Sequence, residues 1–174
     1  PSDLKFPALT YNPPDPAAYR SVYAGGLRAY VAEDRGLPIV TVSALVHFGG
    51  LYLPKDKQGL DTLMSQTMIR GGTKTREGTA IEERLDFLGG SLSFNVSDRT
   101  SSLTLNVLSK DLDEGLDLFF DVLRNPEFRE APLNLARVRQ IEGLRQANDQ
   151  PGAVLSREYD KVLYGDHPLT WQAT

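Results

Sequence analysis

The chain of 174 residues has nearly balanced charges, with 19 Lys and Arg against 23 Asp and Glu, and it contains two His and no Cys. This length supports a hydrophobic core without covalent staples, and the lack of Cys excludes disulfides, thiolate zinc sites and thiol nucleophiles. The mild net charge of −4 argues against a nucleic-acid partner, and charged residues interrupt every apolar run before it is long enough to span a membrane.

The first part of the chain is rich in proline. Residues 1–18 contain five prolines and little hydrophobic periodicity, which predicts an extended N-terminal arm. Residues 19–174 are predicted to form one domain. The chain does not begin with Met and an apolar stretch, so we expect it to be processed or cut from a longer protein.

Five segments have the pattern of strands. Apolar and polar residues alternate on both sides of Ala24-Gly25-Gly26, which predicts a hairpin, and residues 38–48 form a second β-rich segment. Alternation is clearest in 91–97 and 101–109, where Leu92, Phe94 and Val96 are predicted to face the core. We therefore expect 27–33, 38–48, 91–97 and 101–109 to form one mostly antiparallel sheet.

Five segments have helical character, at residues 60–70, 79–88, 111–124, 132–148 and 152–163. Thr79 followed by Glu82 predicts a capping box, Gly89 is expected to end the same helix, and Asp111 and Glu114 are expected to cap the third. The order of strands and helices lacks strict βαβ alternation. It predicts an α+β fold in which helices pack on one side of the antiparallel sheet.

Five segments, taken in order, resemble the N-terminal domain of the insulinase/pitrilysin family of zinc metallopeptidases, which includes the mitochondrial processing peptidase. They are GLRAYV at 26–31, GLDTLMSQTMIRGGT at 59–73, LGGSLS at 88–93, the segment from DL at 111 to NPEF at 125–128, and YGDHP at 164–168. The resemblance covers residues 19–174. The chain resembles a non-catalytic bacterial subunit related to the mitochondrial processing peptidase.

The family's catalysis rests on a His-x-x-Glu-His helix, in which both His bind zinc and the Glu is the general base. The resemblance aligns those three positions with Thr62, Ser65 and Gln66, so both ligands and the base are replaced. The family's third ligand falls on Glu142 or Gly143. The resemblance therefore implies no catalytic residue and no bound cofactor here, although relatives use zinc.

Each of these residues also has an ordinary structural interpretation. Thr62, Ser65 and Gln66 could form a repurposed polar site, but the solvated side of an amphipathic helix is the favoured interpretation. For Glu142, a surface carboxylate near Arg139 and Arg145 is favoured over a remnant ligand. The loop 71–76 resembles a phosphate loop but lacks its spacing, so it is predicted to be a helix-ending turn.

Active relatives hold peptide substrates on an edge strand by β-addition. The corresponding residues here are Ser91, Leu92, Ser93, Phe94 and Asn95, which we predict to bind peptide. The family's Asn-Ala pair is replaced by Ser93-Phe94, and this puts the positioning of a substrate in question.

The resemblance implies a non-catalytic helper subunit in a two-subunit peptidase that cleaves peptides or proteins. Its expected partners are an active sister subunit or a second copy of itself, and a peptide substrate, in a periplasmic or other extracytoplasmic compartment. Two alternatives remain open at this point. One is an active zinc metalloendopeptidase with unrecognised ligands, and the other is a stand-alone peptide-binding module.

Overall fold

The computed structural model describes residues 12–26, 28–33 and 36–173, and the chain divides into two compact units, Pro1–Leu37 and Pro38–Thr174. Most of the predicted arm lies outside the described residues. Its last part forms a short 3-10 helix, Pro16–Tyr19, at which the Asp15 carboxylate accepts a hydrogen bond from the N–H of Ala17 at 2.9 Å.

The first unit contains the predicted hairpin. Strands β1 (Arg20–Val22) and β2 (Arg28–Tyr30) pair antiparallel across the 3-10 turn Ala24–Gly26. Gly25 and Gly26 have φ of 80° and 81°, a region that glycine enters at little cost.

The prediction that 27–33 joins the other strands in one sheet is wrong. Among the residues that the structure describes, strand β2 pairs only with β1, in a two-stranded sheet of its own, and Leu27 lies outside them. The alternation that identifies a strand carries no information about its partner. Here the nearest strand along the chain is the partner.

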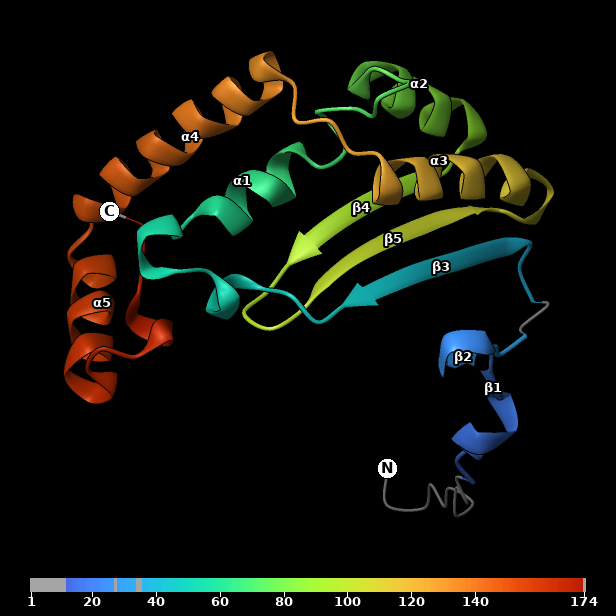
Figure 1. Ribbon diagram of the computed structural model, residues 1–174, viewed down its shortest axis with the longest axis horizontal. Coiled ribbons are helices and arrows are strands. Elements are labelled where there is room, and N and C mark those ends of the chain that lie inside the picture. The colour runs from blue at the N-terminus through green and yellow to red at the C-terminus, as the bar shows by residue number, and fades with distance from the viewer. Residues whose placement is uncertain (1–11, 27, 34–35, 174) are drawn as a thin grey trace, which may run out of the picture. The chain divides into compact units, whose positions relative to one another are not determined.

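The sheet of the second unit has three antiparallel strands in the order β3-β5-β4, namely β3 (Ile39–Val46), β5 (Ser101–Leu108) and β4 (Ser91–Val96) (Figure 1). Leu92 lies opposite Leu105, and Phe94 lies opposite Leu103. Leu92, Phe94 and Val96 are half-buried while the residues between them are exposed, which confirms the predicted register. Strand β4 is an edge of this sheet.

Helices α1 (Leu60–Thr67), α2 (Gly78–Leu88) and α3 (Leu112–Arg124) cover one face of the sheet (Figure 1). The hydrophobic core lies between these helices and the sheet. The predicted α+β fold, with helices on one side of the sheet, is confirmed. Gly115 lets α3 approach β5 closely, since a Cβ there would lie 3.0 Å from Val107. The largest fully buried apolar side chains are Phe119, Ile81, Leu103, Leu105, Val107 and Val122.

Helices α4 (Glu130–Asn148) and α5 (Pro151–Tyr164) follow, and α4 contacts both α1 and α5. Within the described residues, no helix is both long and apolar enough to cross a membrane. Short 3-10 helices complete the unit at Gly50–Tyr52, Lys55–Lys57, Ser109–Asp111 and Pro168–Thr170.

The predicted side-chain caps do not form. Helix α2 begins at Gly78, preceded by Glu77 without a side-chain capping bond, and Glu82 instead lies 3.5 Å from Arg70. The first residue of the helix packs closely on the preceding turn, because a Cβ on Gly78 would collide with the backbone of Arg70. Gly89 does end this helix, with φ of 61°.

Helix α3 departs from its predicted start in the same way. Asp111 occupies the N-cap position of α3 but makes no side-chain capping bond. The Glu114 carboxylate accepts hydrogen bonds from the Arg84 guanidinium of α2, so it joins two helices instead of capping one.

Candidate functional site

An open hollow of about 500 Å³ lies where α1, β4 and α4 meet. Its lining residues come from four segments: Ser65 and Gln66 from α1, Arg70 from the turn that follows, Ser93 and Phe94 from β4, and Arg139 from α4. Helix α1 contacts both β4 and α4, and this arrangement brings the three elements together (Figure 1).

The side of α1 that faces the core is fixed by Thr67 and Met68, which are buried. The Thr67 hydroxyl donates to the carbonyl of Leu63 at 2.6 Å, so it is satisfied within the helix. Ser65 is half-buried and Gln66 is exposed, and both are left to line the hollow. Ser65 donates to the carbonyl of Thr62 at 3.0 Å.

Strand β4 contributes two consecutive residues, Ser93 and Phe94. Consecutive side chains of a strand point to opposite faces of the sheet. A hollow lined by both therefore lies against the free edge of β4 and not over one face.

Two arginines line the hollow and no acidic residue does. Arg70 lies 3.5 Å from Glu82, and both side chains are about half exposed or more, so this pair is weak. The guanidinium of Arg139 is exposed and makes no hydrogen bond or ion pair with any other residue that the structure describes.

The structure brings together only part of the predicted site. Ser65, Gln66, Ser93 and Phe94 share the hollow, whereas Thr62 is exposed on α1 outside its lining. Three other residues of the predicted peptide-binding strand also lie outside it: Ser91, Leu92 and Asn95.

The predicted third-ligand positions do not reach the hollow. Glu142 is exposed on α4 and lies 3.7 Å from Arg145, as its interpretation as a surface carboxylate predicts. Gly143 is exposed and has no side chain. Sequence reasoning did not single out Arg70 or Arg139 as site residues, because they come from segments distant from each other and outside the family's motif.

The lining does not fit zinc. Zinc sites in proteins use imidazole, thiolate and carboxylate ligands, and the hollow offers two hydroxyls, an amide and two guanidinium groups. Neither uncharged oxygens nor cations replace those ligands. Across residues 12–26, 28–33 and 36–173, no group of three or more His, Cys, Asp or Glu is arranged to hold a metal ion.

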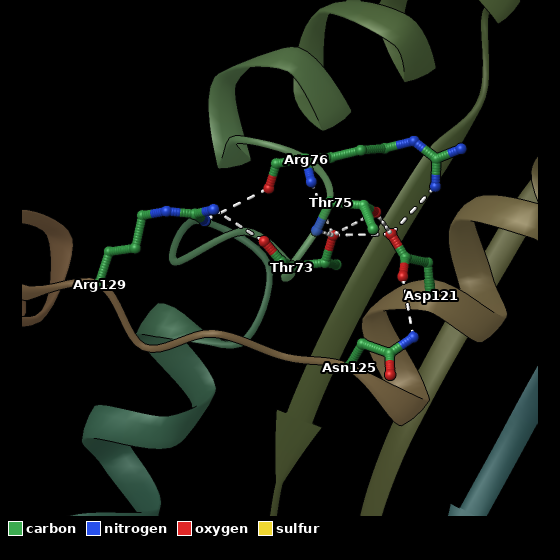
Figure 2. A network of polar contacts seen from close by, with 6 residues as sticks. All are labelled: Thr73, Thr75, Arg76, Asp121, Asn125 and Arg129. Carbon is green, nitrogen blue, oxygen red and sulfur yellow. Dashed lines mark hydrogen bonds and ion pairs between the residues drawn. The ribbon is translucent and has the colours of Figure 1, made fainter.

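A second polar cluster joins the loop between α1 and α2 to the C-terminal end of α3 (Figure 2). Asp121 of α3 accepts hydrogen bonds from Thr73 at 2.7 Å, Thr75 at 2.9 Å, Arg76 at 3.0 Å and Asn125 at 3.1 Å. We call this group, together with Arg129, the loop clamp. Nothing in the sequence pattern singles it out, since Thr73 and Asp121 belong to different elements.

Arg129 completes the loop clamp from the start of α4. Its guanidinium donates to the carbonyls of Gly71 at 2.6 Å and Thr73 at 2.8 Å, and it lies 3.1 Å from Glu127. Gly72, which separates the two carbonyls, has φ of 77°. The segment is therefore the helix-ending turn that its sequence predicts.

The same contacts stabilise the negative charge of Asp121. Partial burial disfavours the carboxylate, but the hydrogen bonds from Thr73, Asn125, Thr75 and Arg76 outweigh it and lower the pKa of Asp121 below its ordinary value. The cluster has every partner it needs within the fold. Its arrangement is that of a structural clamp.

The family model for Insulinase (Peptidase family M16) matches residues 29–171. Subunit 1 of the mitochondrial cytochrome b-c1 complex of Caenorhabditis elegans is 27% identical over 80% of this chain, which spans 29% of that protein. The probable mitochondrial-processing peptidase subunit beta of Arabidopsis thaliana is 26% identical over 83% of this chain and 27% of its own length. The chain thus spans less than a third of these relatives.

Two solved structures share the fold. A peptidase M16 inactive domain from Pseudomonas fluorescens superposes with a TM-score of 0.79 at 23% identity, over 88% of this chain and 37% of that one. The periplasmic protease PqqL of Escherichia coli superposes with a TM-score of 0.79 at 15% identity, over 89% of this chain and 17% of that one. Since the family model covers most of the residues that form the sheet and helices described above, this chain belongs to the insulinase (M16) peptidase family.

Proposed function

We propose that this chain is a domain of a non-catalytic peptidase-family protein, which acts as the helper half of a two-subunit peptidase. The observation that carries the proposal is the lining of the hollow: Ser65 and Gln66 face it with Arg70 and Arg139, and none of these is a zinc ligand.

The alignment of the family's motif supports this interpretation. The family's two His and its Glu correspond to Thr62, Ser65 and Gln66, and two of these three border the edge strand on which relatives hold substrate. The zinc motif is thus degenerate while the scaffold around it is kept. No zinc is expected in this domain.

The relatives add independent support. One similar structure is described as an inactive M16 domain, and the similar mitochondrial proteins are named as subunits. The chain spans less than a third of the curated relatives, so the activity and partners of the whole protein form part of the proposal.

A helper half contributes to catalysis without a metal of its own. By closing a chamber around the peptide it excludes water and orients the scissile bond, and positioning of this kind supplies up to about 7–11 kcal/mol in the best cases. A stable pairing of the two halves is expected to bury roughly 1,200 Å² or more. Strand β4, as a free edge, presents main-chain groups to which an extended peptide can pair.

The compartment is part of the same proposal. We place the protein outside the cytoplasm, and the fold that it shares with a periplasmic protease supports this. Fractionation of cells that express the tagged full-length protein tests it directly. Recovery with cytoplasmic markers would contradict this part alone.

The experiment that tests the helper role compares three preparations: the full-length protein, a sister subunit with an intact His-x-x-Glu-His motif, and the two together. Cleavage of a fluorogenic peptide is expected to be absent for this protein alone, slow for the sister and faster for the pair. A pair in which the sister's general base is changed to Gln is the matched control and is expected to be inactive.

Each other outcome has a definite meaning. Equal rates for the sister with and without this protein contradict the helper role. Chelator-sensitive cleavage by this protein alone identifies it as an active metallopeptidase. Peptide binding without any association with a sister identifies a stand-alone binding module.

A further inference from the structure

The lining of the hollow beside β4 carries two positive charges, of which one is only weakly paired and the other has no partner among the residues that the structure describes. Arg70 and Arg139 line it together with Ser65, Gln66 and Ser93, and its lining contains no carboxylate. Arg139 has no partner among the residues that the structure describes. The chain as a whole has a net charge of −4, so this local excess runs against the overall charge.

We propose that this hollow binds the carboxylate of an Asp or Glu side chain, presented by an extended peptide that pairs with the free edge of β4. The inference rests on the proposed function, in that it names the class of peptide which the helper subunit selects. Guanidinium groups are well suited to the role because they donate charge-assisted hydrogen bonds in the plane of a carboxylate.

The position of the hollow along the strand identifies a side chain as the ligand. Ser93 and Phe94 are the third and fourth residues of the six in β4. A peptide paired along the whole strand passes the hollow at its middle, where it presents a side chain and not its terminus. Side chains of a paired peptide alternate between the two faces of the sheet, so one residue in two is turned toward the face that α1 covers, where Ser65 and Gln66 line the hollow.

The neutral groups around the two arginines complete the site. The hydroxyl of Ser93 and the amide of Gln66 are free of any hydrogen bond that the structure records, and both can donate to a carboxylate oxygen. The Arg70–Glu82 pair at 3.5 Å is exposed, so an incoming carboxylate can compete with Glu82 for Arg70.

The test uses the full-length protein and fluorescently labelled peptides with blocked termini, identical except for a central Glu, Gln or Lys. Anisotropy titrations at low salt are expected to show the Glu peptide binding about tenfold more tightly than the Gln peptide, the usual effect of a charged hydrogen-bonding partner. The Lys peptide is expected to bind more weakly still.

Two variants locate the effect. Arg139→Gln is expected to abolish the preference for Glu over Gln. The matched control, Arg145→Gln, changes an arginine on the same helix that pairs with Glu142 outside the hollow, and it is expected to keep the preference. Both positions are exposed, so both variants are expected to fold.

Three results would overturn the proposal: equal binding of the three peptides, no binding of any of them, or a preference for Glu that survives Arg139→Gln. A fourth peptide, with a central Gln and a free C-terminal carboxylate, separates the two sources of the charge. If it alone binds tightly, the hollow is a site for chain termini and the side-chain proposal is wrong.

Failure here is distinguishable from failure of the proposed function. If the peptides bind equally but the pair of subunits still cleaves faster than the sister alone, the helper role stands and the acidic preference is wrong. If the Glu preference is found but pairing has no effect on cleavage, the acidic preference stands and the helper role is wrong.

Discussion

Arg129 and Arg139 both belong to the α4 region, yet their surroundings differ. Arg129 donates to three loop carbonyls and lies beside Glu127, so its charge is used within the fold. Arg139 borders the open hollow and has no partner among the described residues. The comparison separates two roles for one residue type: the first arginine stabilises the fold, and the second is available to a ligand.

The largest effect on stability is expected at Asp121, the acceptor at the centre of the loop clamp. Asp121→Ala leaves the fully buried Thr73 hydroxyl without its acceptor and removes three further hydrogen bonds. We expect the free energy of unfolding to fall by about 2–4 kcal/mol. Urea unfolding measures this, with Asp117→Ala on the exposed side of the same helix as the control. Equal losses in both variants would show that the clamp has no special role.

Arg129→Gln is expected to cost somewhat less, about 2 kcal/mol, because the loop carbonyls of Gly71 and Thr73 lose a charged donor but a Gln side chain and water restore part of the bonding. Chemical denaturation of this variant beside wild type provides the measurement. A loss below about 0.5 kcal/mol, the usual scale of surface substitutions, would contradict the structural role of Arg129.

The loop clamp also predicts a pH dependence. Because the pKa of Asp121 is lower in the folded than in the unfolded protein, its carboxylate adds stability above the unfolded value of about 3.9, and this stability is lost as the pH falls through the folded value. Wild type is therefore expected to lose more stability than Asp121→Asn when the pH is lowered from 6 to 3. Parallel profiles of stability against pH for the two proteins would show that the clamp does not stabilise the Asp121 carboxylate.

The smallest expected effect on stability is at Arg139. Arg139→Gln removes no recorded contact, so its free energy of unfolding is expected to stay within about 0.5 kcal/mol of wild type. The same denaturation experiment as for Arg129 gives a direct comparison of the two arginines. A loss as large as that of Arg129→Gln would show that Arg139 serves the fold.

Much of the fold was predictable because its elements have one buried face. The alternation at Leu92 and Phe94 predicted both the strand and its register, since a shift by one residue would expose the core face. The sheet to which β2 belongs was not predictable, because alternation identifies a strand without its partner. The capping box predicted at Thr79 does not form because the helix begins at Gly78, which leaves Thr79 inside it.

The candidate site was predictable only in part. The family resemblance pointed to Ser65 and Gln66 on the helix and to Ser93 and Phe94 on the strand, and the fold brings these four together. It gave no reason to expect Arg139 beside them, because the packing of α4 on α1 is a tertiary contact without a signal in either segment. The loop clamp was not predictable for the same reason, since its residues come from different elements.

The zinc content of the purified full-length protein tests the central claim most directly. We expect well under one zinc per chain by elemental analysis, because Thr62, Ser65 and Gln66 stand at the family's motif positions and the lining of the hollow offers no zinc ligand. The triple variant Thr62→His, Ser65→Glu and Gln66→His, which rebuilds the motif, is the positive control and is expected to bind more zinc than wild type. Stoichiometric zinc in the wild-type protein, together with peptide cleavage that is lost when a chelator removes the zinc, would contradict the proposed non-catalytic role.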